Sequence, residues 1–249
     1  MTPDDLLDLL GSAADAVARA VARVDDDKRR ARAGAHPGQY FLDVVADEAA
    51  LGVLHEARVA VVSEESGISG VDGAEITVVL DPVDGSTNCS RQIAYWATSI
   101  CAMDSEGPLV ALVVNHASGS RITAIRGGGA FRDGTPLRPS SVRRVEEAVV
   151  GLAGLPALAL PWAQFRALGC ASLALCEVAA GGLDGYVDGG SYHAPWDYLG
   201  GLLACTESGA AIVDAVGLPL ETSAPSARRQ LIAAATPELL AALRAAAGR

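Results

Sequence analysis

Residues 81–88 read Asp-Pro-Val-Asp-Gly-Ser-Thr-Asn and directly follow an apolar run at residues 76–80. The run predicts a buried strand, so the octet lies where that strand ends. Asp81 and Asp84 can turn their carboxylates toward one point, while backbone N–H groups after them face an anion. Oxygen ligands of this kind suit a hard cation such as Mg²⁺ beside a substrate phosphate. The alternative is an ordinary strand-ending turn, because Asp, Pro and Gly are common in turns.

Composition limits the partners of the chain. A chain of 249 residues that is 50% hydrophobic can bury a large core. Its formal net charge of −11 argues against nucleic acid or an anionic membrane as a partner. The same acidity repels a phosphate ester, so a protein of this charge that handles phosphate needs a bound cation.

The cysteines and the apolar segments bear on the compartment. The five cysteines are odd in number and lack C-x-x-C spacing, which predicts reduced and mostly buried residues. Neither a signal peptide nor a run of 18 apolar residues is apparent. We therefore expect a soluble, cytoplasmic protein.

Periodicity predicts a mixture of helices and strands without strict alternation, which favours an α+β fold. An N-terminal helix begins at residues 2–5, an antiparallel meander follows the octet, and a helix opening at Pro237 ends the chain. The other expected helices are 44–54, 172–180 and 197–208, with Gly200 and Gly201 packed closely against another backbone. The expected strands are 59–63, 97–103, 109–115, 122–126, 130–132, one near Val149, 186–188, 211–213 and 231–234.

Several motifs resemble those of one enzyme family. The octet resembles the signature D-P-[IV]-D-G-[TS]-x-N, and Trp-Asp-Tyr-Leu-Gly-Gly at 196–201 resembles W-D-x-x-[AG]-[AG]. Ser-Glu-Glu-Ser-Gly at 63–67, the glycine-rich stretch 126–137 and the segment 169–186 match further family motifs in family order. The chain thus resembles the inositol monophosphatase family of Mg²⁺-dependent phosphomonoesterases.

This resemblance implies a layered α-β-α-β-α sandwich of the sugar phosphatase type. It implies one unit over residues 1–249, with an α+β half at about 1–140 and an α/β half at about 141–249. The family commonly forms homodimers, so we expect one here.

The resemblance also implies a set of metal ligands. Glu64, Asp81 and the backbone carbonyl of Val83 would hold one Mg²⁺, and Asp81, Asp84 and Asp197 would hold a second. Glu64 would also reach a third, more weakly bound ion. For Asp197 the alternative is a simple helix N-cap.

The implied reaction is attack on phosphorus, in line with the leaving group, by a water that the metal activates. Ser86, where the family usually has Thr, would orient that water together with Glu64, supported by Asp47. The backbone amides of Gly85, Ser86 and Thr87 would bind the phosphate. Asp47 could instead be a plain surface acid, and His193 near Asp197 is an alternative general acid.

Substrate contacts are implied for Asp188, Cys170 and Ala171. The chain departs from the family at two places near them. Residues 40–47 lack the lysine and the Val-Thr pair of the family pattern, which leaves metal affinity open. The linker 189–195 before the Trp-Asp pair is longer than usual, which would reshape the pocket.

These observations lead to the hypothesis of a Mg²⁺-dependent hydrolase of a small phosphate monoester, with inositol 1-phosphate as the first candidate. Histidinol phosphate, fructose 1,6-bisphosphate and 3′-phosphoadenosine nucleotides remain alternatives. A bisphosphate enzyme should carry extra basic residues at its pocket, for which Arg91, Arg126 and Arg166 are available. A non-catalytic scaffold that binds metal or phosphate is the alternative of another class.

Overall fold

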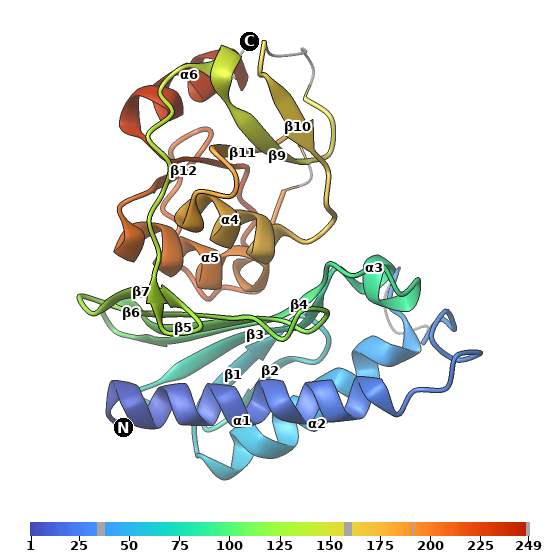
Figure 1. The fold of residues 1–249 in the computed structure, drawn as a ribbon. Helices are drawn as coiled ribbons and strands as arrows, with labels where there is room; N and C mark the ends of the chain where they lie inside the picture. The colour runs from blue at the N-terminus through green and yellow to red at the C-terminus, as the bar shows by residue number, and fades with distance from the viewer. Residues whose placement is uncertain (34–37, 157–160, 191, 248–249) are drawn as a thin grey trace.

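A computed structural model describes residues 1–33, 38–156, 161–190 and 192–247. The chain forms five layers: a helix pair, an eight-stranded sheet, a second helix pair, a five-stranded sheet and a C-terminal helix (Figure 1). Apolar side chains fill each space between neighbouring layers. The α+β class and the α-β-α-β-α sandwich predicted from the sequence are confirmed.

The first layer consists of α1 (Pro3–Ala22) and α2 (Phe41–Glu56). Thr2 caps α1 by accepting a hydrogen bond from the backbone of Asp5, as expected from the start signal in the sequence. Apolar side chains that recur at helical spacing on α1, such as Leu6 and Leu10, are fully buried against the large sheet and α2. Helix α2 begins three residues before the predicted start at residue 44, so Asp43 lies within its first turn.

The large sheet has the order β2-β1-β3-β4-β5-β6-β7-β8. Strands β1 and β3 pair in parallel, and β3 to β8 form the antiparallel meander that was predicted. The predicted strand before the octet does not end there, because β3 runs on through Asp84. The strands are β1 (Ala60–Ser63), β2 (Gly67–Gly70), β3 (Thr77–Asp84), β4 (Ala97–Asp104), β5 (Gly107–Asn115), β6 (Arg121–Ile125), β7 (Gly129–Arg132) and β8 (Thr135–Pro136).

The short helix α3 (Ser86–Ser90) begins within the octet, and two longer helices, α4 (Ala171–Ala180) and α5 (Pro195–Ser208), lie between the two sheets (Figure 1). Helices α4 and α5 form the central layer and pack against the large sheet. The two glycines of α5 permit close contact, as predicted. A Cβ atom on Gly201 would lie 2.5 Å from Cβ of Leu175 on α4, and one on Gly200 would lie 2.8 Å from a methyl group of Val113 on β5.

The second sheet has the order β10-β9-β11-β13-β12 and is covered on its outer side by the last helix. Strands β10, β9 and β11 run parallel, whereas β13 is antiparallel to both of its neighbours. Its elements are a short 3₁₀ turn η1 (Val145–Glu147), β9 (Val149–Ala153), β10 (Gln164–Arg166), β11 (Gly185–Asp188), β12 (Ala211–Asp214), β13 (Leu231–Ala234) and α6 (Pro237–Ala247).

Two further observations concern the compartment and redox chemistry. All five cysteines are unpaired and buried, as predicted. Within the described part of the chain, no helix combines the length and the apolar character that a membrane crossing requires.

Candidate active site

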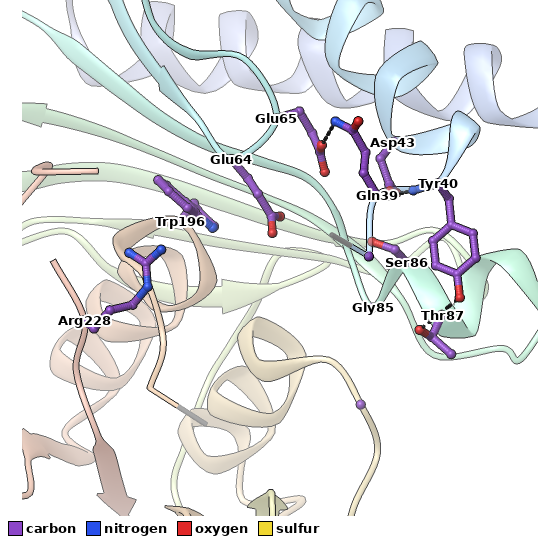
Figure 2. Close-up of a pocket in the computed structure, with 12 residues that line it drawn as sticks. Gln39, Tyr40, Asp43, Glu64, Glu65, Gly85, Ser86, Thr87, Trp196 and Arg228 are labelled. Atoms are coloured by element: carbon purple, nitrogen blue, oxygen red, sulfur yellow. Dashed lines mark hydrogen bonds between the residues drawn. The ribbon is translucent and has the colours of Figure 1, made fainter. Parts of the chain in front are cut away.

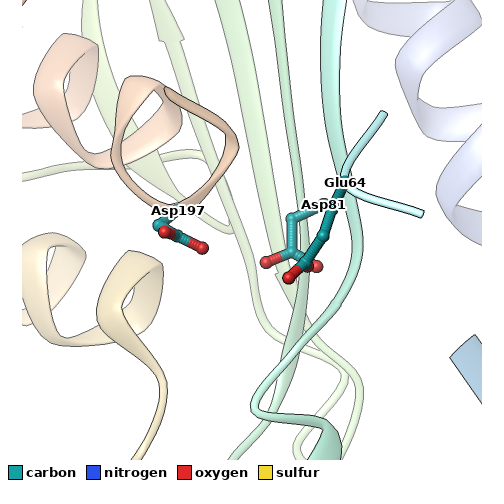
Figure 3. A group of neighbouring side chains, drawn as sticks. All are labelled: Glu64, Asp81 and Asp197. Atoms are coloured by element: carbon teal, nitrogen blue, oxygen red, sulfur yellow. The ribbon is translucent and has the colours of Figure 1, made fainter. Parts of the chain in front are cut away.

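Three of the predicted metal ligands converge between the large sheet and α5. Glu64 follows β1, Asp81 belongs to β3, and Asp197 lies in the first turn of α5. One carboxylate oxygen from each lies within 4.8 Å of the other two, and Figure 3 shows the three side chains directed toward a common point. Parallel pairing explains the first contact, since Ser63 pairs with Leu80 and the N–H of Glu64 donates to the Leu80 carbonyl at 3.1 Å.

Desolvation and mutual repulsion raise the pKa of two acids in this cluster, Glu64 and Asp81. Asp81 is 1% exposed, and its desolvation raises the pKa well above the ordinary value of 3.8, with the charges of Glu64 and Asp84 adding to the shift. The pKa of Glu64 is also raised, first by desolvation and then by the charges of Asp197 and Glu65. Three hard oxygen donors this close together form a donor set that fits a divalent cation.

Asp197 is not the N-cap of α5, which is Ala194, but it belongs both to the first turn of that helix and to the acidic cluster. One of its carboxylate oxygens, Oδ2, accepts the N–H of Ala194 at 2.7 Å, which makes it part of the start of α5. The same carboxylate belongs to the three-acid cluster and lies 3.6 Å from Nδ1 of His193. The N-terminal turn of the helix therefore fixes the direction of this acid.

Asp84 is not part of that cluster in the structure. Its carboxylate accepts the N–H of Ser172 at 2.7 Å, the N–H of Ala171 at 3.3 Å and the thiol of Cys170 at 3.1 Å. It thus binds the amino end of α4, where the helix dipole favours an anion. Burial raises the pKa of Asp84 even so. The role of Asp84 as a ligand of a second ion stays a prediction.

The remainder of the octet folds tightly onto itself. The N–H of Val83 donates to Asp81 at 2.9 Å, and its carbonyl accepts the hydroxyl of Ser86 at 3.0 Å. Gly85 has a φ of 91°, and a Cβ there would lie 3.0 Å from the carbonyl oxygen of Gly169. Glycine is therefore required where β3 turns into α3. The first N–H groups of a helix have no partner within it, so those beginning α3 can bind an anion.

The cluster opens into a cavity of about 580 Å³ (Figure 2). Acidic, hydroxyl and backbone groups make up most of its wall, in keeping with a polar ligand. Its described lining residues are Gly38, Gln39, Tyr40, Asp43, Glu64, Glu65, Gly85, Ser86, Thr87, Gly169, Trp196 and Arg228.

The structure separates two acids on α2, of which one lines the cavity and the other does not. Asp47, the predicted supporting acid, is buried away from the cavity lining and accepts the hydroxyl of Ser63. Asp43, one turn earlier, lines the cavity together with Ser86, and burial raises its pKa to about 7. Sequence reasoning missed Asp43, although its spacing of four residues from Asp47 places both acids on one face of the helix.

A second cavity of about 340 Å³ adjoins the cluster on the side of α4, and Asp84 and Asp197 are among the residues that line it. Cys170 and Ala171 line it, as expected of substrate contacts. Asp188 lines neither cavity among the described residues. Its buried carboxylate instead accepts the N–H groups of Gly190 and Tyr192, both at 2.9 Å, and so holds its own loop. The structure therefore gives no support to Asp188 as a direct substrate contact.

Comparison with known proteins agrees with this geometry. The family model described as "Inositol monophosphatase family" matches residues 12–248. The chain belongs to the inositol monophosphatase family. It is 36% identical over 195 residues to an inositol-1-monophosphatase of Rhizobium meliloti, covering 71% of both chains. It is 30% identical over 206 residues to a fructose-1,6-bisphosphatase of Pyrococcus furiosus, covering 80% of both.

A solved structure supports the fold of this inositol monophosphatase family member. The extragenic suppressor protein suhB from Bartonella henselae superposes with a TM-score of 0.84 at 24% identity, over 98% of this chain and 99% of that one. Membership places the chain among metal-dependent phosphatases, and the acidic cluster is compatible with metal binding. The roles of the individual site residues stay predictions.

Proposed function

We propose that this protein is a Mg²⁺-dependent phosphomonoesterase for a small polyol or sugar phosphate, with inositol 1-phosphate as the first candidate. The observation that carries the proposal is the convergence of Glu64, Asp81 and Asp197, with Glu64 at the wall of the first cavity and Asp197 at the wall of the second. A protein with a net charge of −11 attracts a phosphate ester only if a cation is held where the ester binds.

The donor set determines which cation fits. Glu64, Asp81 and Asp197 would hold Mg²⁺ through carboxylate oxygens, and we infer two ions from the family pattern, with Val83 and Asp84 as further ligands. When bound, Mg²⁺ neutralises phosphoryl charge and lowers the pKa of an attacking water.

The residues of the chain supply position and proton transfer. The N–H groups of Gly85, Ser86 and Thr87 bind the phosphoryl oxygens at the start of α3. The Ser86 hydroxyl and the Asp43 carboxylate line the same cavity as Glu64 and orient the attacking water. Glu64 accepts the proton of that water on a carboxylate oxygen. A new P–O bond forms as the ester P–O bond breaks, and the alcohol leaves with a proton from solvent.

A test measures phosphate release from a panel of inositol, sugar and nucleotide monoesters, with Mg²⁺ and with EDTA. We expect turnover that EDTA abolishes and that Asp81→Asn reduces at least about a hundredfold, because a ligand is lost. Glu48→Gln removes one exposed acid of α2 that lines neither cavity, and it serves as the matched control.

Either of two results would overturn the proposal. Turnover that survives EDTA and Asp81→Asn removes the metal mechanism. A folded protein that releases no phosphate from any ester of a broad panel favours the scaffold role instead.

A further inference from the structure

Arg228 lies on the segment between β12 and β13 and reaches the first cavity. It is the single arginine or lysine among the described residues that line this cavity, whose wall also carries Asp43, Glu64 and Glu65. Figure 2 shows Arg228 and Trp196 on one side of the cavity and Ser86 and Thr87 on the other, with Glu64 between them. The guanidinium therefore lies across the cavity from the proposed phosphate-binding turn.

The guanidinium is held in place by neutral groups. One of its terminal nitrogens, Nη1, donates to the carbonyl of Pro225 at 2.9 Å and to that of Ala227 at 2.7 Å. Its carbon lies 5.6 Å from the ring centroid of Trp196, a cation–π distance. Trp196 itself is buried, and its carbonyl accepts the hydroxyl of Ser99 at 3.1 Å. Arg228 is thus anchored to the residue that immediately precedes Asp197.

Arg228 differs from Arg126 in whether a carboxylate pairs with its guanidinium. It forms no ion pair with any carboxylate in the part of the chain that the structure describes. Arg126, by contrast, pairs with Asp104 and Glu106. An exposed guanidinium at a cavity, with only Nη1 engaged in hydrogen bonds to described residues, is suited to bind a planar or tetrahedral oxyanion through two hydrogen bonds.

The three arginines singled out from the sequence do not occupy this position. Neither Arg91, Arg126 nor Arg166 is among the described residues that line the two cavities at the cluster. Arg166 instead donates to the carbonyl of Phe165 and to the side chain of Gln164. Arg228 is therefore the residue that can supply the extra positive charge expected of a pocket for a doubly charged substrate.

We propose that Arg228, oriented by Trp196, binds a second phosphoryl group of the substrate, carried by the part that leaves as the alcohol. This inference rests on the proposed function, because the first phosphoryl group must lie at the three-acid cluster. It makes Arg228 a specificity-determining residue that favours a bisphosphate over a monophosphate of the same alcohol.

The test compares two esters that differ only in the second phosphate: fructose 1,6-bisphosphate and fructose 1-phosphate. We expect wild-type kcat/KM to be higher for the bisphosphate, and Arg228→Gln to reduce that preference about 10- to 100-fold, the loss expected for a charged hydrogen bond. Arg228→Lys keeps the charge but cannot form two parallel hydrogen bonds to one phosphate, so it should retain part of the preference that Arg228→Gln loses. Arg166→Gln is the matched control with the same change in charge, and it should leave both values as in the wild type.

Equal values of kcat/KM for the two esters in the wild type would overturn the inference. It would also be overturned if Arg228→Gln lowered kcat/KM by the same factor for both esters. If neither ester is hydrolysed, calorimetric titration of both with wild type and Arg228→Gln gives the same comparison without turnover. Tighter binding of the bisphosphate that is lost in Arg228→Gln would then support the subsite even though the proposed function had failed. Equal affinities would overturn it.

Discussion

Glu64, Asp81 and Asp197 bring three acidic groups within 4.8 Å of one another, and desolvation raises the pKa of the first two. An arrangement of this kind opposes folding, because like charges repel and a buried carboxylate loses its hydration. Local destabilisation of this kind is typical of functional sites, where residues required for activity lower the stability of the fold.

Asp81→Asn should therefore stabilise the protein in EDTA while it abolishes activity. Asparagine keeps an oxygen that can accept the N–H of Val83 but carries no charge. We expect the free energy of unfolding to rise by about 1–2 kcal/mol at pH 7.5, measured by urea denaturation. Loss of stability in EDTA would contradict the view that repulsion and desolvation dominate at this residue.

The pH dependence of stability should report on Asp43. Burial raises its pKa from 3.8 to about 7 in the folded chain, so the native state holds a proton that the unfolded state has released. Stability in EDTA should therefore fall as pH rises from about 4 to about 7 and level off above that, because native Asp43 must then ionise.

Asp43→Asn should flatten this decline, by an amount on the order of 1–4 kcal/mol between pH 4.5 and 7.5. The measurement is the difference between wild type and variant in urea denaturation at several pH values, since Asp47, Glu64 and Asp81 contribute with the same sign. Glu56→Gln, which removes an exposed acid from the same helix, is the control. If the free energy of unfolding changed with pH in the same way in wild type and Asp43→Asn, the raised pKa of Asp43 would be contradicted.

The sequence could identify the acidic residues of the site but not the groups toward which their side chains point. Glu64, Asp81 and Asp197 were predicted from motifs, and the structure brings all three together. Asp84 turns instead toward the N–H groups of α4, almost ninety residues away in the chain, which no local pattern specifies. Asp43 and Asp47 share one helix face, and only the tertiary position of α2 decides which of them lines the cavity.

At the level of elements, long periodic segments were predictable and short ones were not. The apolar runs of β4 to β6 and the amphipathic α1 have patterns that bury one or both faces. The elements missed were α3, β2, β8, β10 and the 3₁₀ turn η1, which span two to five residues each. Segments this short are held by neighbours in space, so their own residues carry little signal.

The contact between α4 and α5 should be sensitive to one methyl group. A Cβ on Gly201 would lie 2.5 Å from Cβ of Leu175, which is too close, so the helices must separate. We expect Gly201→Ala to lower the free energy of unfolding by about 1–3 kcal/mol. It should also weaken the Mg²⁺ affinity, because α5 carries Asp197.

Gly52→Ala on α2 provides the matched control for this prediction. A Cβ there meets nothing within 4 Å, and alanine is the better helix former, so stability should rise by about 0.5–1 kcal/mol. Both variants can be measured by thermal denaturation, with calorimetric titration of Mg²⁺ for the affinity. Unchanged stability in Gly201→Ala would show that the layers can repack at no cost.

Across the whole molecule, the candidate metal centre joins two layers. Asp81 belongs to the large sheet and Glu64 directly follows its strand β1, whereas Asp197 belongs to the central helix layer that faces the second sheet. A cation bound by all three links these layers and is lost when the chain unfolds. Binding should therefore stabilise the folded molecule as a whole, in proportion to the logarithm of the ion concentration.

Mg²⁺ should thus raise the midpoint of thermal unfolding. The free energy of unfolding should increase by about 2.7 kcal/mol when the Mg²⁺ concentration is one hundred times its Kd. Hydrogen exchange should slow at β1, β3 and the first turn of α5 together, because the ligands of one ion come from all three. Asp197→Asn should remove both effects, whereas Glu48→Gln should keep them. Slower exchange confined to the large sheet would mean that Asp197 does not share the ion, and the two layers would then be joined by their apolar packing alone.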